Sequence, residues 1–177
     1  MGVKLNPPIL LTPDLDLAEF TCGKPALDEW IKKYALQAGS SGTANTFVLL
    51  DENASLIGYY SLLMGSISQI EATERVRKGT GRYPIPVIVV ARLAVDQRFQ
   101  GQGIGRALLR DAVIRGVNIS KEVAFRAIVT HPIDVEAANF YTKFGFQQSP
   151  ISSGQLMILV KDVRKALGIN SSVSSNG

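Results

Sequence analysis

Apolar residues recur along this chain with two different periods, and each period predicts a different kind of element. Leu27, Trp30, Ile31 and Tyr34 repeat at helical spacing, which predicts a helix over residues 25–38 with a packed apolar face. A Gly-Ser-Ser-Gly run directly after it is expected to end that helix. Dense or β-branched apolar runs predict strands at residues 9–11, 46–50, 56–67, 87–95, 123–129 and 156–160.

The second half of the chain alternates strands with helical patterns. Residues 103–117 place Ile104, Leu108 and Ala112 on one side of a helix, and residues 135–144 form a further helix that ends before a glycine. A polar connection between two strands, residues 71–86, is a functional loop or a short helix plus loop. The pattern predicts an α/β fold with a mixed sheet and packed helices.

The composition supports one globular domain and excludes several classes of protein. The chain has 177 residues, of which 46% are hydrophobic and 19% charged. We expect a single domain over residues 1–166 and a disordered polar tail over residues 167–177. The chain has a single cysteine, Cys22, which excludes an internal disulfide framework. With only one histidine, His131, as well, no metal site built from cysteine or histidine is expected. Without an apolar run long enough for a membrane span or a signal peptide, a cytoplasmic location is expected.

Charge is distributed unevenly. Residues 71–126 carry eleven basic and five acidic side chains, whereas residues 1–70 carry four basic and seven acidic ones. A basic middle third can attract a polyanion such as RNA or a phosphorylated cofactor, or it can be an ordinary solvated surface.

The segment RFQGQGIGRALL, residues 98–109, joins a buried strand to a helix through a glycine-rich turn. Such a turn exposes backbone N–H groups at a helix start, which suits phosphate oxygens, and Arg98 and Arg106 flank it. Arg106 stands where the dinucleotide fingerprint needs glycine, and the P-loop lysine is absent. The remaining pattern is Gln100-x-x-Gly103-x-Gly105; its alternative reading is a helix start that merely needs glycine.

That pattern resembles the acetyl-CoA pyrophosphate loop of the GNAT superfamily of N-acetyltransferases. The strand ARLAV precedes the loop, and AANFYTKFGF, residues 137–146, follows at the spacing of the family's second motif. The resemblance implies a splayed mixed sheet of six to seven strands, helices on both faces, acetyl-CoA as donor and no metal. It also implies a set of cofactor-binding residues: Leu93, Ala94, Val95, Gln100, Gly101, Gln102, Gly103, Ile104, Gly105, Arg106 and Asn139.

Tyr141 is the expected catalytic residue within this resemblance. A phenol with a pKa near 10 is protonated at pH 7 and can protonate the thiolate that leaves when an amine attacks a thioester. The alternative is a packing tyrosine. His131 is the only imidazole available as a base, but its place beside Pro132 equally suits a loop residue at a strand end.

Nearly the whole chain resembles one branch of the superfamily, the GNAT toxins of bacterial toxin–antitoxin pairs (the TacT/AtaT type). The resemblance runs through residues 9–37, 91–112 and 157–160. It implies acetylation of the α-amino group of aminoacyl-tRNA, a block of translation, a ribbon-helix-helix antitoxin, operator DNA bound only through the antitoxin complex, and a homodimer. The alternatives are acetylation of a small amine or a protein, and a non-catalytic acyl-CoA-binding or DNA-complex subunit.

The basic middle third makes an RNA substrate plausible. The residues expected to bind tRNA are arginines and a lysine in or near that third: Arg75, Arg77, Lys78, Arg82 and Arg92. Arg92 has two interpretations, contact with the phosphate of the acceptor stem or an ion pair with an acid such as Asp96. An α-amino group has a pKa near 8, so part of it is neutral at pH 7 and no strong protein base is required.

Overall fold

A computed structural model describes residues 5–168 of the chain, so most of the predicted tail lies outside the described residues. The sheet has seven strands in the order β1-β2-β3-β4-β5-β7-β6. The strands are β1 (Ile9–Leu10), β2 (Asn45–Leu50), β3 (Leu56–Ile67), β4 (Ile85–Val95), β5 (Ala127–Thr130), β6 (Gln147–Gln148) and β7 (Leu156–Leu159). The helices are α1 (Pro25–Lys33), α2 (Ala35–Ser41), α3 (Glu74–Arg77), α4 (Ile104–Ile119), α5 (Val135–Phe144), α6 (Val160–Ala166) and the short 3₁₀ helix η1 (Gln97–Phe99). The predicted α/β fold is confirmed.

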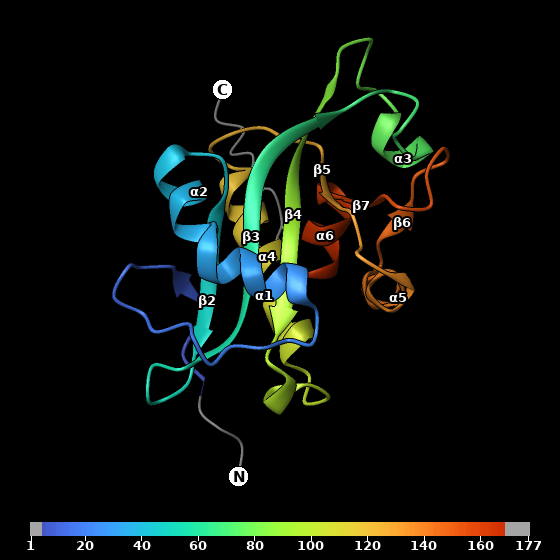
Figure 1. The fold of residues 1–177 in the computed structure, drawn as a ribbon. Helices are drawn as coiled ribbons and strands as arrows, with labels where there is room; N and C mark the ends of the chain where they lie inside the picture. Colours follow the sequence, from blue (N-terminus) through green and yellow to red (C-terminus); the bar gives the residue numbers. More distant parts are fainter. Residues whose placement is uncertain (1–4, 169–177) are drawn as a thin grey trace. The chain divides into compact units, whose positions relative to one another are not determined.

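Contacts divide the chain into two compact units. Among the described residues, the first holds 5–63 together with 89–114, and the second holds 64–88 together with 115–168. In the first unit α1 and α2 lie on one face of the sheet and α4 on the other (Figure 1). The alternation of β3 explains this, because Tyr59 faces α1, where its hydroxyl donates to the Leu27 carbonyl, and Tyr60 faces α4, where it bonds Asp111. Phe20 and Ile31 complete the core on the α1 face.

The second unit is built around β7. This strand pairs antiparallel with both β5 and β6, and α3, α5 and α6 each contact it. The buried strand residues Ile128 and Met157 form its centre. Of the helices in residues 5–168, none combines the length and hydrophobicity that a membrane span requires.

Two predicted elements differ from the structure near helix ends. The helix expected over residues 25–38 is interrupted at Tyr34, whose φ is −118°, and the Gly-Ser-Ser run that was expected to end it is helical up to Gly42. Ile31 and Ala35 keep the apolar face buried across the break, whereas Tyr34 is 50% exposed and is not a core residue.

At two strand boundaries, residues predicted as strand belong to a helix or to its final turn. The strand predicted over residues 123–129 begins only at Ala127, because Val123 closes the C-terminal turn of α4 by donating to the Ile119 carbonyl. Val160 starts α6 instead of ending the last strand. The predicted strands over residues 46–50 and 56–67 form a hairpin, with β2 antiparallel to β3 across the Asp51 turn.

Candidate active site

The glycine-rich turn lies between η1 and α4, in the first unit. Gly101 and Gly103 have φ values of 76° and 81°, in the left-handed region that favours glycine. No atom lies within 4 Å of a Cβ added at either position, so the backbone conformation, not crowding, calls for glycine. The Ala107 N–H makes the first helical bond to the Gly103 carbonyl, and the first turn of α4 has no acidic residue. The turn therefore presents exposed backbone and a helix start without a competing carboxylate.

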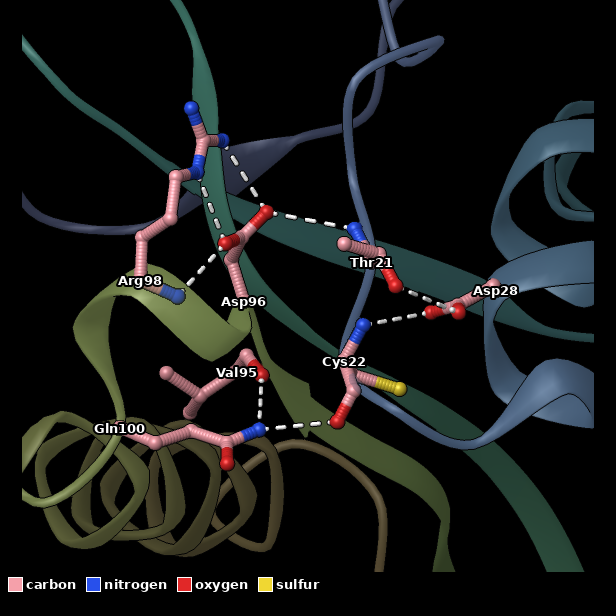
Figure 2. Close-up of polar contacts among 7 residues, drawn as sticks. All are labelled: Thr21, Cys22, Asp28, Val95, Asp96, Arg98 and Gln100. Atoms are coloured by element: carbon pink, nitrogen blue, oxygen red, sulfur yellow. Dashed lines mark hydrogen bonds and ion pairs between the residues drawn. The ribbon is translucent and has the colours of Figure 1, made fainter.

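Asp96 anchors the base of this turn. Its side chain is fully buried and accepts hydrogen bonds from the Arg98 backbone and guanidinium and from the Thr21 N–H (Figure 2). Burial alone would raise the pKa of Asp96, but these hydrogen bonds outweigh it and hold the pKa below its ordinary value. Of the two interpretations of Arg92, the ion pair with Asp96 is not observed, because Arg98 occupies the carboxylate.

Gln100, the first residue of the glycine motif, points inward. Its Nε2 donates to the carbonyls of Cys22 and Val95, at 2.9 and 2.8 Å (Figure 2). The amide nitrogen thus ties the end of β4 to a segment 78 residues earlier in the chain. Arg98 is also engaged within the unit, whereas Arg106 is exposed and makes no ion pair within residues 5–168.

The segment that receives these bonds is held in turn by Asp28 on α1. Its carboxylate accepts from the Cys22 N–H at 2.8 Å and from the Thr21 hydroxyl at 3.3 Å. Burial is the main cause that raises the pKa of the Cys22 thiol to about 11, so the thiol is protonated at pH 7 and unsuited to act as a nucleophile. Cys22 is accordingly a small buried residue of the core.

Gly58 on β3 sets how closely β4 and α4 approach. A Cβ at this position would lie 2.8 Å from the Ala94 carbonyl oxygen and 2.8 Å from Leu108 Cδ1. Ala94 and Val95 are buried, and the Asp96 N–H bonds the Ile57 carbonyl next to them. The resemblance assigns cofactor contacts to the end of β4. That segment can pack this closely against β3 only because residue 58 has no side chain.

We expect Gly58→Ala to lower the free energy of unfolding by about 1–3 kcal/mol, the usual cost of overpacking against backbone. Gly39→Ala is the matched control, because Gly39 is helical and its nearest neighbour to a new Cβ is 3.9 Å away. That control should be neutral or stabilising by up to ~1 kcal/mol. Urea unfolding measures the free energy of unfolding of both variants. Equal values would contradict the prediction, because they would mean that β4 shifts to accommodate the new methyl group with no loss of stability.

Tyr141 lies on α5, in the second unit, and is only 5% exposed. Phe140 and Phe146 meet its ring edge-on, with centroids 5.2 and 5.4 Å away. Burial raises the pKa of Tyr141, and a hydrogen bond with the side chain of Thr130 partly offsets the rise. The phenol is therefore protonated at neutral pH and has a fixed orientation. Asn139, on the same helix, is exposed.

Two acidic residues lie at the start of α5. Asp134 caps the helix by accepting from the Ala137 N–H at 2.8 Å, and Glu136 lies in its first turn. His131 is exposed in the loop before them. No group of histidine, cysteine or acidic side chains within residues 5–168 is arranged to hold a metal ion.

The basic residues around α3 that are predicted to bind tRNA differ in whether they form an ion pair within the protein. Arg75 forms an ion pair with Asp162 on α6, with Nε 2.9 Å from Oδ2. Arg77, Lys78 and Arg82 are exposed and make no ion pair within the described part of the chain. The role of Arg126 could not be predicted from the sequence: its guanidinium donates to three backbone carbonyls in and after α3, those of Arg75, Val76 and Lys78.

Arg92, on β4, is stacked on Trp30. Its guanidinium carbon lies 4.1 Å from the centroid of the indole ring. Trp30 in turn stacks on Tyr59, with centroids 6.1 Å apart and an angle of 18° between the rings. Trp30 is partly buried against the core, as predicted, and forms a flat base for the guanidinium.

Comparison with known proteins gives the family of this chain, a similar toxin and solved structures with the same fold. Residues 43–148 match the family described as the acetyltransferase (GNAT) domain. A "tRNA-acetylating toxin" of Mycobacterium tuberculosis is 39% identical over 153 residues, which cover 86% of this chain and 91% of that protein. Two solved structures share the fold. AtaT complexed with acetyl-methionyl-tRNAfMet has a TM-score of 0.85 at 22% identity and covers 92% of this chain and 99% of its own. A mutant AtaT toxin bound to the C-terminus of the antitoxin AtaR and acetyl-CoA has a TM-score of 0.78 at 22% identity, covering 92% and 98%.

Proposed function

The chain belongs to the GNAT acetyltransferase family, and from this premise we propose that it acetylates the α-amino group of aminoacyl-tRNA and thereby blocks translation. The observation that carries the proposal is the 39% identity, over 86% of the chain, to a protein named as a tRNA-acetylating toxin. The exposed basic residues around α3 support it, since RNA backbones are bound through such side chains.

Acetyl-CoA is the proposed donor, and all of its proposed contacts except Asn139 belong to the first unit. The exposed N–H groups of the turn at Gly101 and Gly103 and the start of α4 suit a pyrophosphate. The backbone of Leu93, Ala94 and Val95 is assigned to the pantetheine arm, and Gln102, Ile104, Gly105, Arg106 and Asn139 complete the proposed contacts. Gln100 is assigned an indirect role, because its amide nitrogen donates to the Val95 carbonyl and so holds the end of β4 in place.

The proposed reaction forms a C–N bond and breaks a C–S bond. The neutral α-amino group attacks the thioester carbonyl, and the tetrahedral intermediate expels the thiolate. Tyr141 gives its proton to that thiolate, while the amine loses a proton to solvent. An α-amino group has a pKa near 8, so this chain needs no strong base for the attack.

The experiment that tests the proposal uses radiolabelled acetyl-CoA with charged and uncharged total tRNA. Label on an aminoacyl ester of the charged sample alone is the expected result. Label that appears only on added polyamines or on protein would favour the alternative, an acetyltransferase for small amines or proteins.

We further propose that the toxin is neutralised by an antitoxin, as the structure of AtaT with the C-terminus of AtaR suggests. A ribbon-helix-helix antitoxin that binds operator DNA, a homodimeric toxin and a cytoplasmic location remain predictions from the resemblance. Co-expression with the neighbouring open reading frame, followed by size-exclusion chromatography with light scattering, tests the pairing and the stoichiometry.

The RNA surface is proposed to include Arg77, Lys78 and Arg82, with Arg75 holding α3 in place through Asp162. We expect the double change Arg77→Glu and Lys78→Glu to weaken tRNA binding about tenfold or more and to lower the salt slope by about two, because two phosphate contacts are lost. Acetyl-CoA affinity should not change. Filter binding at several salt concentrations measures both values.

The matched control reverses the same charge at two other exposed lysines, Lys121 and Lys165. A similar loss of tRNA binding in this control would mean that total charge, not the α3 surface, governs binding. Arg75→Glu is excluded from the test, since it would also break the ion pair with Asp162.

A further inference from the structure

Arg92 is a partly buried guanidinium without an anionic partner. It makes no hydrogen bond and no ion pair with any residue from 5 to 168; its contact is the stack on Trp30. Burial lowers the pKa of Arg92, because the charged form loses water. Arginine remains protonated even so, and its donors are left to a ligand.

The acidic side chains of α1 and of the residue that follows β4 are engaged elsewhere. Asp96 is held by Arg98, Asp28 binds the Thr21 hydroxyl and the Cys22 N–H, and Glu29 pairs with Lys33. A side chain that is charged, partly desolvated and packed on an aromatic ring is preorganised for an anion from outside the protein.

The stack fixes where that anion would bind. Tyr59 supports Trp30 from below, and its hydroxyl is anchored on the Leu27 carbonyl at 2.7 Å. The indole covers one face of the guanidinium, so hydrogen bonds form only at its edge, in the plane of the group. The planar edge of a guanidinium can donate two parallel hydrogen bonds to a phosphate, which a flexible lysine side chain cannot do.

The position of Arg92 along β4 distinguishes two possible sources of the phosphate, the cofactor and the RNA. Arg92 precedes Leu93, Ala94 and Val95, and the glycine turn follows them, so the proposed pyrophosphate site lies past the other end of this segment. Arg92 is about 7 Å along the strand from Ala94, close to the proposed position of the pantetheine arm.

We propose that Arg92, packed on the ring of Trp30, binds a phosphodiester of the acceptor end of the RNA substrate. The proposal rests on the proposed function and adds to it a determinant of acceptor binding. Arg92 contacts the substrate, and Trp30 is a positioning residue that acts through Arg92.

The test compares Arg92→Gln, Arg92→Lys, Trp30→Leu and Trp30→Phe for binding of charged total tRNA and of acetyl-CoA. Arg92→Gln should raise the Kd for charged tRNA about 10- to 100-fold, the range for one or two hydrogen bonds to a charged group. Arg92→Lys should recover little of the loss, because lysine lacks the planar fork. Trp30→Phe keeps an aromatic base and should bind more tightly than Trp30→Leu.

Two comparisons distinguish positioning from general stability or charge. The double variant Arg92→Gln/Trp30→Leu should bind tRNA no more weakly than Arg92→Gln alone, because Trp30 acts through the guanidinium. Arg110→Gln, which removes an exposed arginine from α4, is the control for charge and should leave the Kd within about twofold, as expected for a surface charge.

The proposal is overturned if Arg92→Gln changes tRNA affinity less than threefold, or if acetyl-CoA affinity falls as much as tRNA affinity does. The second result would assign the anion to the cofactor. Additive effects of the Trp30 and Arg92 changes would instead show that Trp30 does not act through Arg92. If the parent protein binds charged tRNA but acetylates none of it, the proposed function fails while the binding series still decides the role of Arg92.

Discussion

Tyr141→Phe is expected to lower kcat by roughly 10²–10⁴, the usual contribution of a positioned general acid. The ring is buried between Phe140 and Phe146, so phenylalanine keeps the packing and removes only the hydroxyl. Acetyl-CoA affinity should stay within about threefold, since the proposed phosphate contacts are in the glycine turn. Single-turnover kinetics on charged tRNA, with calorimetry for the cofactor, measures both quantities.

Tyr60→Phe is the matched control. Tyr60 is also a buried tyrosine, and its hydroxyl bonds Asp111 at 2.5 Å, so the change likewise removes a hydrogen bond from the interior. Its kcat should remain near that of the parent. If Tyr141→Phe keeps more than about a third of parental turnover while Tyr141→Ala loses it, Tyr141 is a packing residue and the proton comes from His131 or an ordered water.

The second large effect is expected at the glycine turn, where Gly103→Asp and Gly105→Asp should each abolish measurable acetyl-CoA binding. Both place a carboxylate beside the proposed pyrophosphate. Their effects on the fold should differ. Gly103 has a φ of 81°, so any side chain there is strained, whereas Gly105 lies in the first turn of α4, where an acidic residue favours the helix.

This difference separates charge from strain. Gly105→Asp should unfold at the same temperature as the parent or higher, yet fail to bind acetyl-CoA in calorimetry. Gly103→Asn, which is neutral and tolerates the left-handed region, should retain part of the affinity. Binding of acetyl-CoA by both Asp variants within about threefold of the parent would remove the turn from the cofactor site.

Elements bounded by strong local signals could be predicted from the sequence. The strand over residues 56–67 and the helix over residues 135–144 were predicted with their observed bounds, because a turn or a glycine marks their ends. The break at Tyr34 was not predictable, since residues on both sides of it fit one helical pattern. The two-residue strand β6 has no periodicity, and it forms because β7 offers a partner.

The site was predictable as a set of residues and not as a set of contacts. The sequence located the glycine turn and Tyr141, whose proposed roles come from a family resemblance. It did not show that the amide nitrogen of Gln100 and the guanidinium of Arg98 are used inside the protein. These bonds depend on residues 21 and 22, far away in the chain, and local patterns carry no information about such partners.

The hydrogen bonds of Gln100 and Asp96 also constrain the order of folding. Their partners at Cys22 and Thr21 are 78 and 75 residues away, so the chain must close a long loop before the base of the turn is complete. A nascent chain therefore cannot assemble the turn until residues 95–100 have emerged and met the segment before α1. We expect the amides of residues 96–103 to gain protection late in pulse-labelled hydrogen exchange, after those of the local hairpin β2–β3. The proposed cofactor site would then form late in folding, after the hairpin, because it needs contacts between distant segments of the chain.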